Sequence, residues 1–345
     1  MLSGLYIYII MQNSKVIFNR QQLLKNLKSL GAENICAMVK ANAYGVGVKK
    51  VCTALLGKVK YFGVANMPEA LEIRIFDKTT PILVVGISSD FDNAISHNID
   101  LTIESVEMLL ILQKYIKNTN KKIKIHLKIN TGMNRLGLDT INEFKLCLKI
   151  IQKSPNIVLA GVFTHFATIN EDNIFLQKQI KKFKQFCNII PPIFNPIIHI
   201  GGGSIVKKIN IKKHPEIMVR AGLELYRHTI KIESKIIKIR NIQKGDRVGY
   251  SNGFVADKNY EIGIIPLGYA DGINRKLSNL GYVKLGKQHC KIIGNICMDM
   301  FFIDLTNTNS KLGDTVQIFW DENHWAQTLD TIPYEILTNL KVRGQ

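Results

Sequence analysis

The segment YFGVANMPEALEIRIF, residues 61–76, combines a short apolar run with a helix start. Its first five residues are apolar enough for a buried strand. Asn66 then stands where a helix N-cap is expected, and Pro68 suits the first helical turn. Glu69 lies three residues after the cap, where its carboxylate can complete a capping box. We therefore predict a strand followed at once by a helix.

The same alternation extends on both sides of this segment. Apolar runs predict eight strands, over residues 35–39, 61–65, 81–86, 100–103, 123–129, 160–163, 197–200 and 218–223. Between them, apolar residues at helical spacing predict helices over segments that include 68–76, 105–117, 141–152 and 174–187. Eight strand-then-helix units in order predict an α/β fold, a (β/α)8 TIM-like barrel.

After Tyr226 the pattern changes to alternating strands with turns at Gly245, Gly286 and Gly313. Strands are expected over residues 230–239, 261–267, 290–296, 301–305 and 315–319, with few helices before the tail near Tyr334. We predict two domains, the barrel over residues 12–228 and a mostly-β C-terminal domain over residues 229–345.

Composition limits the class of protein. The 345 residues are 46% hydrophobic and 21% charged, which is typical of a globular chain with a sizeable core. No apolar run reaches the ~18–20 residues that a membrane span needs. The apolar residues 1–10 lack basic residues and a cleavage site, so we interpret them as an extension or an upstream start rather than a secretory signal. Six scattered cysteines indicate reduced thiols and a cytoplasmic protein.

The formal net charge is +19, and lysine supplies most of it. A strongly basic chain can bind nucleic acid, and such binding would weaken with salt. The lysines are spread along helix-like segments, and no helix-turn-helix, zinc-finger or RNA-binding motif accompanies them. We therefore predict a solvated, lysine-rich surface, with no specific nucleic-acid partner, no membrane partner and no metal.

The segment AMVKANAYG, residues 37–45, places Lys40 at the end of the first predicted strand. In a barrel of this kind, chemistry sits where the strands end. The apolar residues before Lys40 desolvate its amine in part, which lowers a lysine pKa and favours the neutral nucleophile. The alternative is a surface lysine that merely follows a core strand.

Seven motifs in order resemble those of one family. VKANAYG resembles the cofactor-lysine motif of alanine racemases, which are fold-type III pyridoxal-phosphate amino-acid racemases. Six further segments follow in family order: KINTGMNRLGL (128–138), GVFTHFA (161–167), VRAGLELY (219–226), VGYS (248–251), PLGYADGINRKL (266–277) and GNICMDMFFIDLT (294–306). The resemblance implies an isomerase that uses pyridoxal 5′-phosphate to interconvert L-alanine and D-alanine for peptidoglycan. It also implies a homodimer in which each β domain completes the partner's active site.

The resemblance further implies roles for single residues. Lys40 anchors the cofactor and exchanges the α-proton on one face of the substrate, and Tyr250 from the partner subunit does so on the other. Arg220 faces the pyridine nitrogen, and because a guanidinium keeps its proton, that nitrogen stays unprotonated and transamination is disfavoured. The other cofactor-binding residues are Tyr44, His165, Ser204, Gly222 and Leu223.

Substrate and entrance residues follow from the same motifs. Arg135 and Met298 correspond to contacts of the substrate carboxylate. Lys128 matches a position that is carbamylated in several members, where the new anion orients Arg135. The entrance is implied at Tyr269, Arg275 and Asp299.

Three departures from the family pattern and two alternatives accompany this interpretation. Gly203 replaces a side-chain donor in the phosphate loop, Asn295 replaces an entrance arginine, and the tail, residues 340–345, lacks the usual closing motif. These changes bear on cofactor affinity and on the entrance. One alternative is a serine or broad-specificity racemase of the same fold. The other is a non-catalytic pyridoxal-phosphate carrier, a class without the β domain and the second-face tyrosine.

Overall fold

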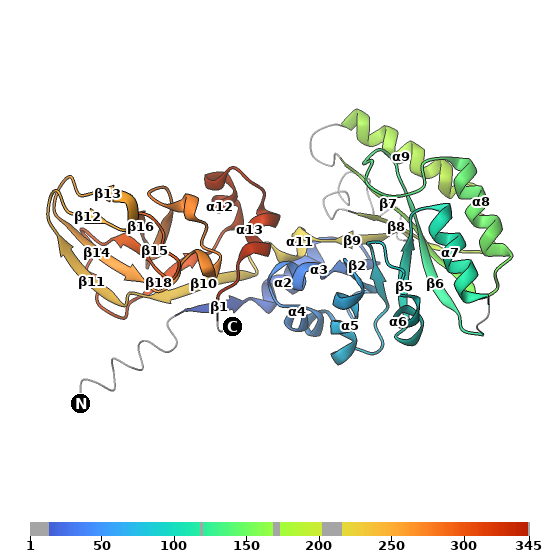
Figure 1. Ribbon diagram of the computed structural model, residues 1–345, viewed down its shortest axis with the longest axis horizontal. Coiled ribbons are helices and arrows are strands. Elements are labelled where there is room, and N and C mark those ends of the chain that lie inside the picture. Colours follow the sequence, from blue (N-terminus) through green and yellow to red (C-terminus); the bar gives the residue numbers. More distant parts are fainter. Residues whose placement is uncertain (1–13, 118–119, 168–172, 202–215, 344–345) are drawn as a thin grey trace. The chain divides into compact units, whose positions relative to one another are not determined.

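The computed structural model describes residues 14–117, 120–167, 173–201 and 216–343. These residues form two compact units, which are coloured by sequence in Figure 1. One unit contains residues 23–225. The other contains the described residues up to 22 together with those from 226 onward.

The first unit is a closed barrel of eight parallel strands in sequence order. Its last strand pairs with its first, with Arg220 opposite Cys36, and this pairing closes the barrel. The predicted eight strands and the barrel are confirmed. The strands are β2 (Ile35–Met38), β3 (Tyr61–Val64), β4 (Ile82–Val84), β5 (Ile99–Ile103), β6 (Ile123–Ile129), β7 (Ile157–His165), β8 (Ile197–Gly201) and β9 (Met218–Ala221).

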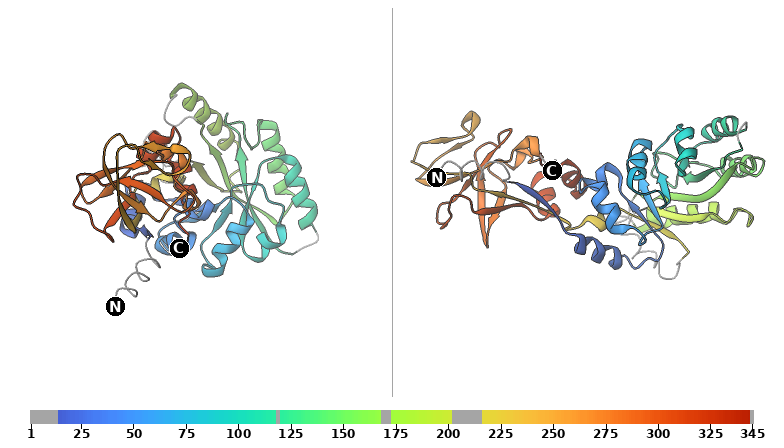
Figure 2. Two further views of the ribbon diagram at one scale, coloured as in Figure 1. Left: turned by 60° about the vertical axis from the view of Figure 1, so that its left-hand side comes forward. Right: turned by 90° about the horizontal axis from the view of Figure 1, so that it is seen from below.

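Helices surround the barrel strands (Figure 1; Figure 2). α8 shows why they form: Thr140 and Glu143 make a reciprocal capping box, and Phe144 and Leu148 are buried one helical turn apart. The four predicted helices are confirmed. The helices of this unit are α2 (Arg20–Ser29, which begins just before it), α3 (Lys40–Tyr44), α4 (Val48–Leu55), α5 (Met67–Phe76), α6 (Phe91–Ser96), α7 (Val106–Ile116), α8 (Ile141–Gln152), α9 (Asn173–Cys187) and α11 (Leu223–Tyr226).

The second unit is built on an antiparallel sheet of eight strands in the order β1-β10-β18-β15-β16-β17-β14-β11. Its core includes Val283, Phe301 and Phe319, all fully buried. The predicted mostly-β domain is confirmed, although the single strand expected over 230–239 is two. The strands are β1 (Lys15–Phe18), β10 (Ile230–Lys235), β11 (Lys238–Ile242), β14 (Tyr260–Ile265), β15 (Tyr282–Leu285), β16 (Gln288–Ile293), β17 (Phe301–Asp304) and β18 (Thr315–Phe319).

Short elements complete the second unit. β12 (Arg247–Val248) and β13 (Phe254–Val255) form a separate two-stranded ribbon. The 3-10 turns are η2 (Tyr250–Asn252), η3 (Tyr269–Asp271) and η4 (Arg275–Leu277), and the tail carries α12 (Glu322–Leu329) and α13 (Pro333–Asn339). The three turns therefore begin with Tyr250, Tyr269 and Arg275, which the sequence singles out as candidate site residues.

The N-terminal segment differs from the expected division of the chain. The sequence predicts that this segment belongs to the barrel domain, from residue 12. In the structure β1 pairs antiparallel with β10, with Lys15 opposite Glu233, so this strand belongs to the β unit. The expected boundary at residue 228 remains a prediction.

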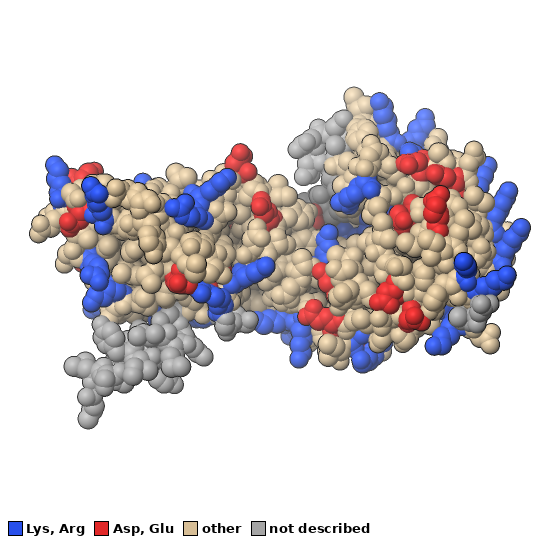
Figure 3. Space-filling view, in the orientation of Figure 1, with Lys and Arg blue, Asp and Glu red and all other residues tan. Residues whose placement is uncertain are grey.

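Lysine and arginine side chains do not gather in one patch on the face shown in Figure 3. They are spread over both units and are interspersed with Asp and Glu. Among the described residues, no helix is both long enough and apolar enough to cross a membrane.

Candidate active site

Cationic side chains gather where the barrel strands end. Lys40 follows β2, Lys128 lies near the end of β6, and Arg220 lies on β9. Lys128 and Arg220 are buried, with exposed fractions of 6% and 4%. A small pocket at this end is lined by Lys128, Ile129, Asn130, Met133, Arg135, Leu136 and His165. The barrel therefore brings together five of the residues singled out in the sequence.

These five groups are close enough for the charge of one to change the pKa of another. The pKa of Lys40 is lowered by burial and then by the charge of Arg135. Burial and Arg135 also lower the pKa of Lys128 to about 8. Burial and Arg220 lower the pKa of His165 to about 3. The site thus holds an excess of positive charge, which favours an anionic ligand and a neutral lysine.

A left-handed turn fixes the backbone after Lys40. Residues 41–44 have φ values between 52° and 57° without any glycine among them. Each such residue costs about 1–2 kcal/mol. Asn42 offsets part of this cost, because its Oδ1 accepts a hydrogen bond from the Val48 N–H at 2.8 Å. Strained backbone of this kind is common at functional sites.

Glu69 holds the same turn from the neighbouring strand-to-helix junction. The Asn66 side chain accepts from the Glu69 N–H at 3.1 Å, so the predicted N-cap is confirmed. The predicted capping box is wrong, because the Glu69 carboxylate accepts instead from the N–H groups of Ala41 at 2.8 Å and Ala65 at 2.7 Å. One carboxylate therefore ties the end of β3 to the turn that carries Lys40.

Replacing Glu69 with alanine should loosen this turn. Two hydrogen bonds to a half-buried carboxylate would be lost, and we expect the free energy of unfolding to fall by about 1–3 kcal/mol. Urea denaturation measures the change. The matched control is Glu72→Ala, an exposed glutamate on the same helix. Equal stability of the two variants would contradict the assigned role of Glu69.

Arg220 is held inside the barrel by three contacts. Its Nη2 donates to the Thr164 carbonyl at 2.7 Å, and its Nη1 lies 2.8 Å from His199 Nδ1. Its guanidinium carbon lies 4.5 Å from the centre of the Phe163 ring, a cation–π distance. Burial lowers the pKa of Arg220 to about 10, which still leaves the group charged near neutral pH.

Gly201 explains how His165 and Arg220 approach each other. A Cβ atom on Gly201 would lie 2.1 Å from His165 Nδ1 and 2.6 Å from Arg220 Nη2. Both distances are shorter than any real contact, so no larger residue fits unless these side chains move. The last residue of β8 must therefore be a glycine for this arrangement.

The residues expected near a phosphate lie partly within the described chain. Tyr44 is buried, and its hydroxyl lies 2.7 Å from the position that a Cβ atom on Gly222 would take. Leu223 follows Gly222 and begins the short helix α11. Ser204 lies outside the described residues. Tyr44 and the backbone after β9 are thus neighbours at the same end of the barrel.

Tyr250 and the remaining predicted residues lie in the β unit. Tyr250 begins η2 and is 70% exposed, and its carbonyl accepts a hydrogen bond from Asn295 Nδ2 at 2.8 Å. The Tyr269 N–H donates to the Cys297 carbonyl at 3.1 Å, next to Met298. Adjoining loops therefore carry Tyr250, Tyr269 and Met298, each with an exposed side chain.

The tail of the chain also joins these loops. Arg343 makes a bidentate ion pair with the buried Asp271, at 2.9 and 3.0 Å, and a further contact of 2.8 Å with Asp299. Burial alone would raise the pKa of Asp271, but its hydrogen bonds from Arg343 and the Gly268 N–H lower it below the usual value. Arg275 begins the nearby turn η4.

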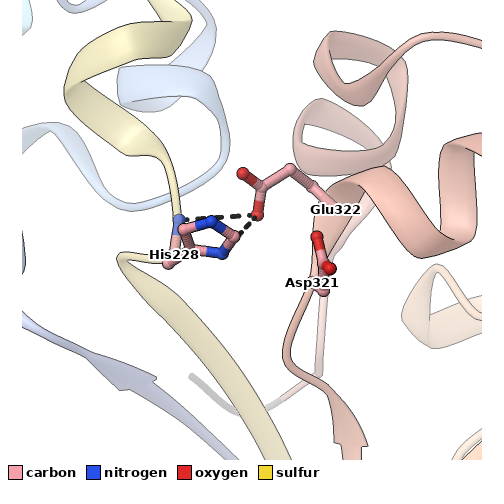
Figure 4. Close-up of side chains that lie close together, drawn as sticks. All are labelled: His228, Asp321 and Glu322. Carbon is pink, nitrogen blue, oxygen red and sulfur yellow. Dashed lines mark hydrogen bonds and ion pairs between the residues drawn. The ribbon is translucent and has the colours of Figure 1, made fainter.

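A second cluster of ionisable side chains lies at the start of α12 (Figure 4). Glu322, which is buried, has one carboxylate oxygen 3.5 Å from the His228 N–H and 3.8 Å from His228 Nδ1. Asp321 lies beside them and caps α12 by accepting from the Asn323 N–H. We assign this cluster the role of joining the segment before β10 to the start of α12, because its contacts are those of a helix cap and an ion pair.

Comparisons with known proteins identify the class of protein that this barrel, β unit and site define. Solved structures of alanine racemases share the fold. The structure from Clostridium difficile 630 has a TM-score of 0.87 at 28% identity and covers 96% of this chain and 94% of its own. Alanine racemase from Bartonella henselae, solved with covalently bound pyridoxal phosphate, has a TM-score of 0.85 at 25% identity, covering 96% and 98%. The class is that of the amino-acid racemases, which are isomerases.

The family follows from the sequence comparisons. Residues 14–229 match the model of the alanine racemase N-terminal domain, and residues 229–345 match that of the C-terminal domain. Alanine racemase from Staphylococcus carnosus is 31% identical over 93% of this chain and 90% of its own length. That from Helicobacter acinonychis is 32% identical over 90% of each. The chain belongs to the alanine racemase family.

Several residues of the site are not predicted by the sequence. For Glu69 the sequence predicts only a part in a capping box, and it does not predict the salt bridges of Arg343. Asp100, His126 and His199 were not singled out, although all three are buried in the barrel. The available signal is a polar residue inside an otherwise apolar strand, as with His199 in IIHIG (197–201).

Proposed function

We propose that this protein interconverts L-alanine and D-alanine with pyridoxal 5′-phosphate, in the cytoplasm, as a supply of D-alanine for peptidoglycan. The observation that carries the proposal is the position of Lys40. Its amine is partly buried at the end of a barrel strand, and both burial and Arg135 lower its pKa. An amine in that setting is the kind that reacts with an aldehyde.

The residues at the barrel end fit an aldehyde cofactor that bears a phosphate. Lys40 would hold the aldehyde carbon, and the positive charge of the pocket would attract the anion. Tyr44, with the backbone at Gly222 and Leu223, offers groups for the phosphate, and Ser204 is proposed to add a hydroxyl. When bound, pyridoxal phosphate would withdraw the electron pair left at the substrate Cα, which makes that carbon acidic enough to lose its proton.

Arg220 and His165 would bind the cofactor ring. Arg220 donates hydrogen bonds and does not accept them, so it would meet the ring nitrogen as a donor and leave it without a proton. His165, with a pKa of about 3, is neutral and can lie against the ring without adding charge. Less charge at the ring nitrogen would favour return of the proton to Cα over transamination.

Inversion at Cα requires a proton carrier on each face of the substrate. We assign Lys40 to one face and Tyr250 to the other, each taking or giving the proton at Cα. Tyr250 would come from the partner subunit of a homodimer. Its side chain and those of Tyr269 and Met298 are exposed within this chain, as expected for groups that work on a partner.

The substrate carboxylate is proposed to bind Arg135 and the backbone amide of Met298. A planar guanidinium can meet both carboxylate oxygens at once. Tyr269, Arg275 and Asp299 would line the entrance. Arg343 contacts Asp299 and so would help to hold that rim in place.

We further propose that Lys128 carries a carbamate that orients Arg135. A carbamate forms on a neutral amine, and with a pKa of about 8 roughly a tenth of Lys128 is neutral at pH 7. With ¹³C-bicarbonate, NMR should show one protein-bound carbamate whose signal grows as the pH rises through about 8. Lys128→Met should remove this signal, whereas Lys124→Met, at an exposed position on the same strand, should keep it. A signal that survives Lys128→Met would refute the assignment.

The identity of the substrate is best tested by a screen. A histidine racemase from Leuconostoc mesenteroides shares the fold, with a TM-score of 0.86 at 22% identity, so the fold does not decide the substrate. The purified protein, supplied with pyridoxal phosphate, should be incubated with each proteinogenic L-amino acid and the D-form measured. We expect alanine to be racemised fastest. A preference for serine or many substrates would support the broad-specificity alternative, and no racemisation at all would overturn the proposal.

A further inference from the structure

A continuous chain of hydrogen bonds between buried polar side chains crosses the barrel, and Arg220 is at one end of it. Arg220 Nη1 lies 2.8 Å from His199 Nδ1, and His199 Nε2 lies 2.8 Å from His126 Nδ1. His126 Nε2 lies 3.1 Å from Asp100 Oδ2, which also accepts from the Tyr61 hydroxyl at 3.0 Å. These groups come from five strands, β9, β8, β6, β5 and β3. The chain thus joins a cation at one wall of the barrel to a carboxylate at another.

The direction of every hydrogen bond in this chain follows from its first member. Arg220 can only donate, so His199 Nδ1 must be the acceptor and carries no proton. Neutral His199 therefore holds its proton on Nε2 and donates to His126 Nδ1. By the same logic His126 holds its proton on Nε2 and donates to the Asp100 carboxylate. Both imidazoles are fixed as neutral Nε2–H tautomers.

Burial makes this arrangement hard to change. Asp100, His126, His199 and Arg220 are each at most 4% exposed. The His199 ring stacks on Phe163, with centres 4.6 Å apart, and Phe163 also lies under the Arg220 guanidinium. A proton added to His199 Nδ1 would point at the guanidinium, and the pKa of His199 is accordingly well below its usual value, through burial and then Arg220.

The small residue Gly161 makes room for the middle of the chain. A Cβ atom there would lie 2.1 Å from His126 Nδ1, the atom that accepts from His199. Gly161 on β7 thus serves His126 as Gly201 on β8 serves His165. Two adjacent strands therefore each carry a glycine beside a histidine ring, and Gly161 leaves His126 the space that its hydrogen bonds require.

We propose that Asp100, His126 and His199 are positioning residues that hold the buried guanidinium of Arg220 in one orientation. This inference rests on the proposed function, because it gives Arg220 its orientation toward the cofactor ring. His199 and Thr164 take one N–H from each of Nη1 and Nη2. The remaining N–H groups of the guanidinium can then donate to a ligand while the side chain keeps its orientation.

The tautomers can be tested without any cofactor. ¹⁵N NMR of the cofactor-free protein distinguishes Nδ1–H, Nε2–H and doubly protonated imidazoles. We expect both His126 and His199 to be Nε2–H tautomers, as the hydrogen-bond directions require. Assignment would come from the single variants His126→Gln and His199→Gln. A proton on Nδ1 of either imidazole would overturn the proposal.

The positioning role can be tested by interrupting the chain at its centre. His126→Leu removes both the acceptor and the donor, whereas His126→Gln keeps an amide oxygen and an amide N–H that can replace them. In the leucine variant we expect the His199 ring signals to shift. Since a charge-assisted network is broken, racemisation should fall about tenfold and the share of turnovers lost to transamination should rise. The glutamine variant should recover most of the racemisation rate and most of the wild-type preference for racemisation over transamination. His289→Leu, at an exposed histidine on β16, is the matched control and should behave as wild type.

These outcomes separate the inference from the function on which it rests. A folded His126→Leu protein with unchanged racemisation and unchanged transamination would overturn the positioning role. Equal racemisation and equal transamination in His126→Leu and His126→Gln would also overturn it. If His126→Leu does not fold, the wild-type ¹⁵N tautomers and the glutamine variant decide the question. Absence of any bound pyridoxal phosphate would instead overturn the proposed function and leave the tautomer pattern intact.

Discussion

Lys40→Ala should lose racemisation by about 10⁴-fold or more, because one substitution removes both the cofactor anchor and a proton carrier. Treatment of the cofactor-loaded wild-type protein with borohydride should fix a pyridoxyl group on one lysine. Peptide mass spectrometry should place it within residues 37–45, on Lys40. The variant should show neither the fixed group nor the visible absorbance of the bound cofactor.

The control for this experiment is Lys49→Ala. Lys49 is exposed on α4, nine positions along the chain from Lys40. It should keep both the adduct on Lys40 and full turnover. An adduct on another lysine in the wild-type protein, or activity that survives Lys40→Ala, would show that the assignment of the anchor is wrong.

Tyr250→Phe should slow racemisation by about 10²–10⁴-fold, the usual effect of losing a general acid–base group. The phenyl ring keeps the shape of the side chain, so the loss should be chemical and not structural. Because Lys40 still serves one face, the variant should still exchange the α-hydrogen of one enantiomer with solvent. Proton NMR in D₂O would follow this exchange, and chiral chromatography would follow racemisation.

The matched control is Tyr282→Phe, a partly exposed tyrosine on β15 in the same unit. It should leave both measurements unchanged. Equal loss of exchange for both enantiomers in Tyr250→Phe would indicate that the hydroxyl acts in binding or positioning. Unchanged racemisation would refute the two-base assignment.

Much of the barrel could be predicted because its signals are local. Runs such as those at β2 and β3 are apolar and are followed at once by helices. Parallel strands that are buried on both faces typically have this composition. The β unit was harder. The break between β10 and β11 falls inside one segment of alternating apolar and polar residues, and β15 is short with only Val283 fully buried. Nothing within four residues distinguishes such a strand from a loop.

The site divides in the same way. Lys40 and Arg220 were accessible to sequence analysis because motifs surround them. Glu69 and Asp100 act on groups that are close in space but 28 and 26 positions away, at Ala41 and His126. Their partners depend on which strands are neighbours in the closed barrel, and that arrangement is known only once the whole fold is in view.

The pairing of β1 with β10 constrains how the chain can fold during synthesis. Lys15 leaves the ribosome more than 200 residues before its partner Glu233. At about 5–20 residues per second, the first strand waits at least roughly ten seconds without its neighbour while the whole barrel is made. An unpaired strand is open to pairing with other chains during that interval. Lys15 at the start of β1 and the polar residues 19–22 after it would then limit aggregation of the nascent chain before the sheet forms.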